Sequence, residues 1–245
     1  MKVHQFIAPA AALALLGAAS SATAQQTSAT LEVRGEITPP ACKIVFDDNG
    51  ELTFTRAFNA LDAGGTKLDT KEISMNVTCD APTRVAVKLT DAKAATTIAY
   101  GDVTSSAWVD NSAASAFTGS IFGLGTTPDD DGTPIKIGGF MIQTANGAAT
   151  VDGNAGVMQG LAADDTLYYS NNPYIISTLT TDNGYIKNGY TFARGGWQSS
   201  GTVPVAFESA ATTLKVTPTI AKSSTLPAGD EIQLDGLVNF ELRYL

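Results

Sequence analysis

Strict two-residue alternation in residues 29–37 constrains the fold of this chain more than any other stretch of its sequence. Small or apolar residues occupy the odd positions, namely Ala29, Leu31, Val33, Gly35 and Ile37, and the even positions carry Thr, Glu, Arg and Glu. Successive side chains of a β-strand point to opposite faces, so this pattern predicts a strand with one buried face and one exposed face.

The same alternation recurs along the rest of the chain. Residues 73–79 and 85–89 predict two antiparallel strands separated by a turn at Asp80-Ala81-Pro82. Further strands are expected at 42–46, 135–144, 175–181, 203–207, 213–217 and 238–244, with 51–54 as a short hairpin arm. No helix is predicted after the first 24 residues. Period-2 patterning with turn signals throughout predicts an all-β protein of the β-sandwich class.

Turns and loops are expected where Gly, Pro, Asn and Asp cluster. Residues 47–50, 128–132 and 226–230 predict turns, 148–160 predicts a glycine-rich loop, and Gly138-Gly139 indicates a bulge. Short strands and loops anchored by Trp108 and Phe117 are expected between residues 91 and 120. The run Asp129-Asp130-Asp131 is acidic, but it lacks the spacing and the closing glutamate of an EF-hand, so a solvated turn is the better interpretation.

The first 24 residues have the features of a secretory signal peptide. Lys2 precedes an apolar run from Phe6 to Ala19, and small residues at 22–24 offer a cleavage site before Gln25. Removing 24 of the 245 residues leaves 221, and the net charge changes from −9 to −10 because Lys2 is lost. The chain is therefore expected to be exported, without a membrane span in its mature form.

Two cysteines, Cys42 and Cys79, remain in the mature sequence. An even number of cysteines in an exported chain predicts a disulfide, worth roughly 4 kcal/mol in the chain-entropy description. A metal site is the alternative, but no further ligands accompany the pair.

The composition argues against several classes of function. Strong acidity disfavours nucleic acid as a partner, because it repels phosphate. His4 is the only histidine and is expected to leave with the signal peptide. The mature chain then has no Ser–His pair, no imidazole base and no phosphate-binding glycine loop. Carboxylates are plentiful, but no pair stands out as a glycosidase site. No enzyme activity, catalytic residue, metal site or cofactor is expected.

Both ends of the sequence resemble a known family. Gly35 interrupts the apolar face at its fourth position, Cys42 follows seven residues later, and the chain ends in the alternating strand 238–244 with Tyr244 next to last. These features resemble the pilins, the structural subunits of chaperone–usher fimbriae. Within that family the chain is most similar to longer fimbrial-type proteins of an uncharacterised (DUF1120-like) domain family. A turn of the type Ala228-Gly229-Asp230 is also typical of pilins.

The resemblance implies an incomplete, pilin-type immunoglobulin-like sandwich. Its parts would be a signal peptide (1–24), a donor-strand extension (25–41) and a body (42–245) with a long insertion between residues 91 and 200. The sandwich would lack its last strand and expose an apolar groove that a periplasmic chaperone fills first. The extension of another fimbrial subunit, through Ala29, Leu31, Val33, Gly35 and Ile37, would then replace the chaperone. The C-terminal strand would line the groove and face the chaperone through Val238, Phe240, Leu242 and Tyr244.

A structural subunit of a surface fimbria is therefore the leading expectation. The partners would be a periplasmic chaperone, an outer-membrane usher and other fimbrial subunits, and the location would change from the periplasm to the cell surface. Two alternatives stay open. A fimbrial adhesin or sugar-binding subunit would use the aromatic residues of the middle region, namely Tyr168, Tyr169, Tyr174, Tyr185, Tyr190, Phe192 and Trp197. A self-contained exported β-sandwich would instead pair residues 29–37 in its own sheet.

Overall fold

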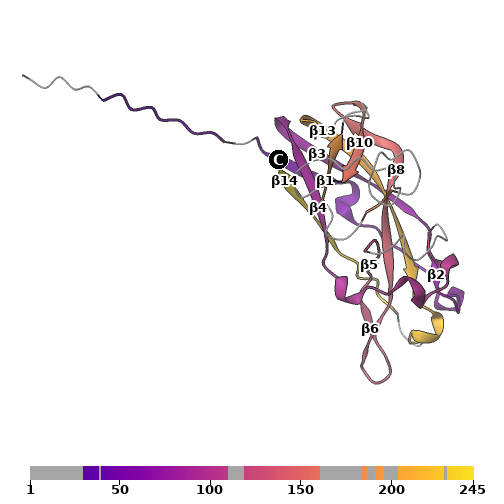
Figure 1. The fold of residues 1–245 in the computed structure, drawn as a ribbon. Coiled ribbons are helices and arrows are strands. Elements are labelled where there is room, and N and C mark those ends of the chain that lie inside the picture. The colour runs from indigo at the N-terminus through magenta and orange to yellow at the C-terminus, as the bar shows by residue number, and fades with distance from the viewer. Residues whose placement is uncertain are drawn as a thin grey trace, which may run out of the picture. The chain divides into compact units, whose positions relative to one another are not determined.

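The computed structural model describes residues 30–38, 40–109, 119–160, 184–186, 191–195, 204–228 and 231–245 (Figure 1). Within these ranges, 145–148, 157–160 and 191–195 are described by their backbone alone. The chain divides into two units, residues 1–38 and residues 39–245. The predicted signal peptide and its cleavage site lie outside the described residues.

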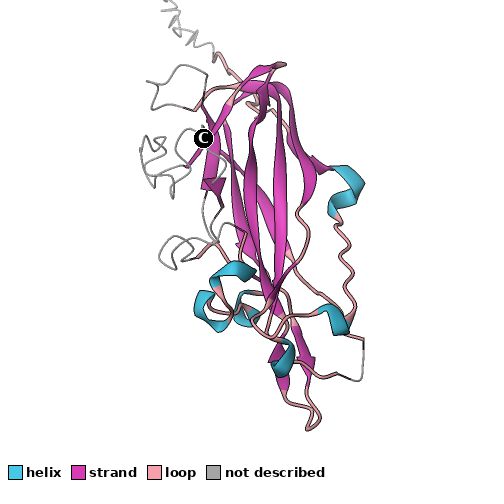
Figure 2. Ribbon diagram, turned by 90° about the vertical axis from the view of Figure 1, so that its right-hand side faces the viewer, coloured by secondary structure: helices cyan, strands magenta, loops and turns pink. Residues whose placement is uncertain are grey.

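The described residues between 40 and 245 form an all-β sandwich, as the alternating sequence predicts (Figure 2). The large sheet has the order β1 (Cys42–Phe46), β3 (Lys71–Thr83), β13 (Phe207–Ile220), β8 (Gly138–Val151) and β11 (Gly184–Tyr185). Three short strands join it: β2 (Thr66–Lys67), β5 (Phe122–Gly123) and β9 (Asn154–Ala155). The small sheet has the order β10 (Val157–Gly160), β12 (Thr191–Gly195), β4 (Val85–Asp91) and β14 (Val238–Tyr244).

A separate hairpin and several single turns complete the described elements. The hairpin pairs β6 (Thr126–Pro128) with β7 (Pro134–Lys136) around the predicted acidic turn, where Asp129 Oδ1 accepts hydrogen bonds from the backbone of Asp131 and Thr133. The helical elements of the described residues are short 3-10 turns: η1 (Asp47–Gly50), η2 (Phe58–Ala60), η3 (Ala94–Thr96), η4 (Tyr100–Asp102), η5 (Ser105–Ala107) and η7 (Ser223–Thr225).

The core lies between the facing sides of the two sheets. The alternating residues Ile73, Met75 and Val77 of β3 are buried, and so are the alternating residues of β4. A smaller second cluster gathers Ile98, Val103, Trp108, Met141 and Tyr185, and it includes the β8 residue Met141, whose neighbours Phe140 and Ile142 belong to the main core. Trp108 is therefore the buried anchor that the sequence predicts, whereas Phe117 lies outside the described residues.

The turn predicted at Asp80-Ala81-Pro82 is wrong. β3 continues through these residues to Thr83, and β4 belongs to the other sheet, so the two strands do not pair with each other. Pairing with β13 jumps from Thr78↔Ser209 to Thr83↔Phe207, which leaves Pro82 at an irregularity of the ladder. Proline lacks a backbone N–H and is tolerated at such a point without the loss of a ladder hydrogen bond.

Several other boundaries also differ from the prediction. Of the described residues of the strand expected at 203–207, only Phe207 is in a strand, where it begins β13, and β13 also contains the strand expected at 213–217. The loop expected at 148–160 is instead the end of β8, then β9 and β10, and Asp152 and Gly153 form the two-residue connection between β8 and β9. Both residues have positive φ (47° and 76°), and Asp-Gly is a favoured pair for this kind of hairpin turn.

Gly138 and Gly139 do not form a bulge, because their pairing with Ile220 and Thr219 is continuous. They mark a close approach instead: a Cβ at Gly138 would lie 2.2 Å from the carbonyl oxygen of Thr219. Residues 51–54 form no strand, so the predicted hairpin arm is also wrong. The strand expected at 175–181 lies outside the described residues.

The order of the main strands follows the immunoglobulin arrangement. β1, β3, β13 and β8 take the places of strands A, B, E and D, and β4 and β14 take those of C and F. In that arrangement a strand G lies beside F. Among the described residues, no strand lies beside the free edge of β14.

Candidate strand-binding groove

Two strand edges meet at one end of the sandwich. β1 is an edge of the large sheet and β14 is an edge of the small sheet. The backbone N–H of Cys42 donates a hydrogen bond to the hydroxyl of Tyr244 (2.8 Å), and the rings of Phe46 and Phe240 pack edge to face with centroids 4.8 Å apart. These contacts hold β1 and β14 together, and we call this the closed end.

The two edges separate beyond Phe46 and Phe240. The turn η1 follows β1, and its residues Asp48, Asn49 and Gly50 all have positive φ, so the chain leaves the strand direction sharply. Residues 51–57 then run without strand pairing along one side, and residues 231–237 do so along the other side. We call these segments the 51–57 rim and, together with the first residues of β14, the 231–240 rim.

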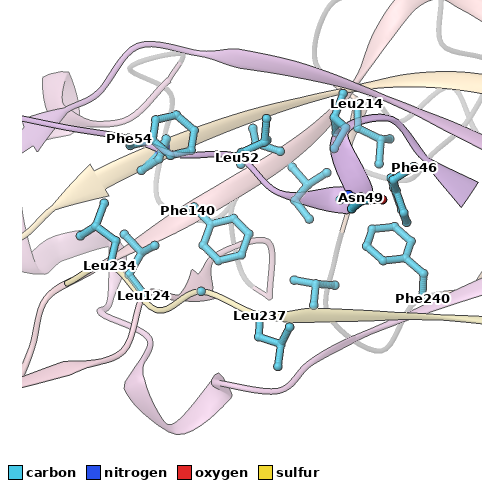
Figure 3. Close-up of a pocket in the computed structure, with 17 residues that line it drawn as sticks. Phe46, Asn49, Leu52, Phe54, Leu124, Phe140, Leu214, Leu234, Leu237 and Phe240 are labelled. Carbon is cyan, nitrogen blue, oxygen red and sulfur yellow. The ribbon is translucent and has the colours of Figure 1, made fainter.

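Burial alternates along both rims, although residues 51–57 and 231–237 belong to no sheet. Leu52 and Phe54 are half-buried between exposed neighbours, and Ile232 and Leu234 show the same pattern. Figure 3 shows Leu52 and Phe54 on one side of the groove and Leu234, Leu237 and Phe240 on the other, with Phe140 between them. Each rim therefore has the side-chain pattern of a strand without a neighbour.

The space between the rims is an apolar groove with a volume of about 370 Å³ next to Phe240, and it continues toward Arg56 and Glu231. Its floor is the inner face of the large sheet together with Leu124. The floor residues near β14 are Ile73, Leu124, Phe140, Ile142, Leu214, Val216 and Pro218. An apolar surface between two unpaired rims is the kind of site that one additional β-strand could fill.

The free edge of β14 also offers backbone hydrogen-bonding groups. Leu245 N–H donates to Arg84 and the Leu237 carbonyl accepts from Ala92, so the odd-numbered residues bond toward β4. In an antiparallel ladder the directions alternate, so the even-numbered residues turn their N–H and C=O groups toward the free edge. These are the same residues whose side chains point into the sandwich.

Gly236 shapes the middle of the groove. A Cβ at this position would lie 2.7 Å from Cε1 of Phe140 and 3.3 Å from Cδ2 of Leu124. Because Gly236 has no side chain, Phe140 reaches the 231–240 rim and raises the groove floor there.

The disulfide expected between Cys42 and Cys79 is present and joins directly opposite residues of β1 and β3. The C-terminal strand is also present, with Val238, Phe240 and Leu242 half-buried. Val238 and Phe240 line the groove. Leu242 and Tyr244 lie toward the closed end, where Tyr244 is 45% exposed and its hydroxyl accepts the bond from Cys42.

Residues 30–38 are described as extended chain without an assigned strand. The side chains of Leu31, Val33 and Ile37 are 88%, 86% and 99% exposed. No atom lies within 4 Å of the position that a Cβ of Gly35 would take. Ala29 lies outside the described residues.

The two rims are not part of the site that the sequence predicts. Glu51-Leu52-Thr53-Phe54 alternates and predicts a hairpin arm, and no groove role is predicted for Ile232 or Leu234. The detectable signal was alternation continuing upstream of β14, interrupted by Gly236.

The described residues offer few other sites. They contain no cluster of three or more His, Cys, Asp or Glu side chains able to hold a metal ion. No helix among them is long and apolar enough to cross a membrane. Tyr185, which the sugar-binding alternative would need at the surface, is buried. The other aromatic side chains of that alternative lie outside the described residues.

One protein family and one individual protein are similar to this chain. Residues 31–141 match a family with the description "Protein of unknown function (DUF1120)". Over 249 aligned residues the chain is 29% identical to Protein GltF of Escherichia coli (strain K12), and the alignment covers 95% of this chain and 94% of that protein. The family match includes both cysteines and the 51–57 rim but not β14. Neither description states an activity.

Proposed function

We propose that this chain is a structural subunit of a chaperone–usher fimbria, exported to the periplasm and polymerised on the cell surface by strand donation. The observation that carries the proposal is the open groove between the 51–57 and 231–240 rims. It is apolar, it lies at the position of strand G, and one of its borders is the free edge of β14.

The chain also carries a segment with the composition of the missing strand. Leu31, Val33 and Ile37 alternate with polar residues and are exposed. Burying three aliphatic side chains stabilises a complex by roughly 2 kcal/mol each, and an added strand also gains ladder hydrogen bonds with the β14 edge. The segment of one subunit would therefore complete the sandwich of the next, and a periplasmic chaperone would occupy the groove before assembly.

A subunit without residues 25–38 tests this function, because it can accept a strand but cannot donate one. Alone it should form no polymer, and mixed with the full chain it should terminate growing polymers, so that mean polymer length falls as its fraction rises. Electron microscopy of mixtures at fixed total concentration measures the length.

The melting temperature of the shortened subunit is the control. It should match that of the full-length monomer, because the deleted residues belong to a separate unit. A clear drop would show instead that the segment stabilises its own sandwich. Unchanged polymer length in the mixtures would contradict the proposed function.

A further inference from the structure

We infer that the donated strand docks in one register, with Arg34 of the donor facing Asp235 of the acceptor and the two strands antiparallel. This inference rests on the proposed function and adds the residues that align the two subunits. It follows from the number of groove positions, the charges along the rim and the course of the chain after the donor segment.

The number of inward positions is the same on both sides. The 231–240 rim turns Ile232, Leu234, Gly236, Val238 and Phe240 toward the groove, and the donor offers Ala29, Leu31, Val33, Gly35 and Ile37. Antiparallel pairing of these two sets matches Ile37 with Ile232 at the open end and Ala29 with Phe240 at the closed end. The smallest side chain of the donor, other than glycine, then lies where Phe46 and Phe240 narrow the groove.

The outward charges restrict this alignment. The donor carries Glu32, Arg34 and Glu36 on its polar face, and Asp235 is an outward carboxylate at the centre of the rim, with a side chain 63% exposed and paired with Lys93. In the proposed register Arg34 lies opposite Asp235. A shift of two residues in either direction places a glutamate there instead, and like charges directly opposite each other destabilise a strand pair.

The course of the chain after the donor segment determines the direction. In the antiparallel arrangement Gly35 faces Leu234 and Val33 faces Gly236, and the residues after Ile37 leave at the open end. A parallel strand with Arg34 at Asp235 would place Gly35 opposite Gly236. It would also direct Pro39 and Pro40 toward the closed end, where β1 and β14 are already in contact.

A second antiparallel register also satisfies the charges. It pairs Arg34 with Glu241 and Glu32 with Arg243, but it moves Leu31 and Val33 beside Tyr244 and Leu242. At that end Cys42 already bonds to Tyr244, and the groove beside Ile232, Leu234 and Gly236 would stay empty. The register that pairs Arg34 with Asp235 therefore fills the groove better than the register that pairs Arg34 with Glu241.

Cysteine pairs distinguish these arrangements in full-length subunits. Outward pairs of the proposed ladder are not hydrogen-bonded pairs, and their Cα atoms are about 4.5 Å apart, within the range for a disulfide. The native bond between Cys42 and Cys79 likewise joins opposite residues of an antiparallel pair. One subunit would carry Gln233→Cys as acceptor, and the other would carry Glu36→Cys or, as a matched control, Glu32→Cys.

The proposed register predicts an intermolecular link between Glu36→Cys and Gln233→Cys, and none from Glu32→Cys. A parallel strand reverses this result. The register at Glu241 gives neither link and joins Glu36→Cys to Asn239→Cys instead. Non-reducing electrophoresis of assembled polymer, with mass spectrometry of the linked peptides, identifies the pair.

Charge exchange provides a second measurement that needs no cysteine. Arg34→Glu should slow polymer assembly about two- to fivefold, the range of an exposed ion pair. Asp235→Lys in the same subunit should restore the rate, and Glu241→Lys should not. Melting temperatures of the variants would show that the sandwich is folded.

The results of these experiments distinguish a wrong register from a wrong function. Rescue by Glu241→Lys, or a link at Asn239→Cys or from Glu32→Cys, overturns the register and leaves strand donation standing. Polymer without any of these links also overturns the register. No polymer from the wild-type chain in the presence of its chaperone and usher overturns both proposals.

Discussion

Gly236 and Gly35 have different surroundings in the structure. Gly236 lets Phe140 reach the rim, so its role lies within the folded sandwich. No atom lies within 4 Å of the position that a Cβ of Gly35 would take. Gly35 stands out in the sequence because it interrupts an alternating face. The role of Gly236 was not predictable, because its tight contact with Phe140 joins residues about a hundred positions apart, and local patterns carry no such information.

Replacing Gly35 with leucine should block docking and leave the subunit folded. In the proposed register the new side chain would face Leu234, and overpacking of this kind costs about 1–3 kcal/mol. Polymer yield should fall at least fivefold, with Gly35→Ala intermediate, whereas chaperone-complex yield and the monomer melting temperature stay unchanged. Normal fibres, or equal loss of complex and polymer, would contradict the role assigned to Gly35.

At the scale of elements, strands were easier to predict than their partners. The alternation in β3, β4 and β14 predicted these strands correctly, because burial of one sheet face requires apolar residues at every second position. The turn wrongly placed at Pro82 shows the limit. Proline and aspartate indicate where a ladder of hydrogen bonds is interrupted. The local sequence is similar whether the chain then turns back within the same sheet or crosses to the other sheet. The 51–57 rim shows a related limit, because its alternation is that of a strand but no partner is present.

The unpaired rim should be visible in amide hydrogen exchange. In the monomer, the amides of Leu234, Gly236 and Val238 face the open edge and should exchange rapidly, whereas those of Asp235 and Leu245 are bonded to Leu124 and Arg84 and should be protected. In the polymer, the first three should become protected by a factor of ten or more, and the bonded pair should change little. Rapid exchange of the even-numbered amides in polymer would show that no strand docks there.

At the scale of the whole molecule, the all-β sandwich and the disulfide were predictable, because both follow from composition and periodicity. The groove was predictable only through the family resemblance. Its walls come from β1, β8, β13 and β14, and the closed end joins Cys42 to Tyr244, 202 positions apart. Distances of this kind depend on how strands are ordered in the two sheets, which alternation alone does not specify.

The position of the disulfide has a mechanical consequence. Cys42 is the first residue of β1, and its bond to Cys79 spans 37 positions of the chain. A pulling force that enters the sandwich at residue 41 therefore passes through the sulfur bridge directly into β3. The residues between the two cysteines, including the whole 51–57 rim, lie in a loop that bears no tension.

Stretching single molecules between residue 41 and the C-terminus would measure this bypass. Unfolding with the bond intact should release about 13 nm less chain than unfolding after reduction, since 37 residues extend to about 3.5 Å each. Equal lengths would show that the bond does not carry the force. With the bypass in place, tension that enters a subunit through its own extension would reach β3 without stretching the chain between Cys42 and Cys79, so the 51–57 wall of the groove would not be unravelled from that side while a donated strand occupies the groove.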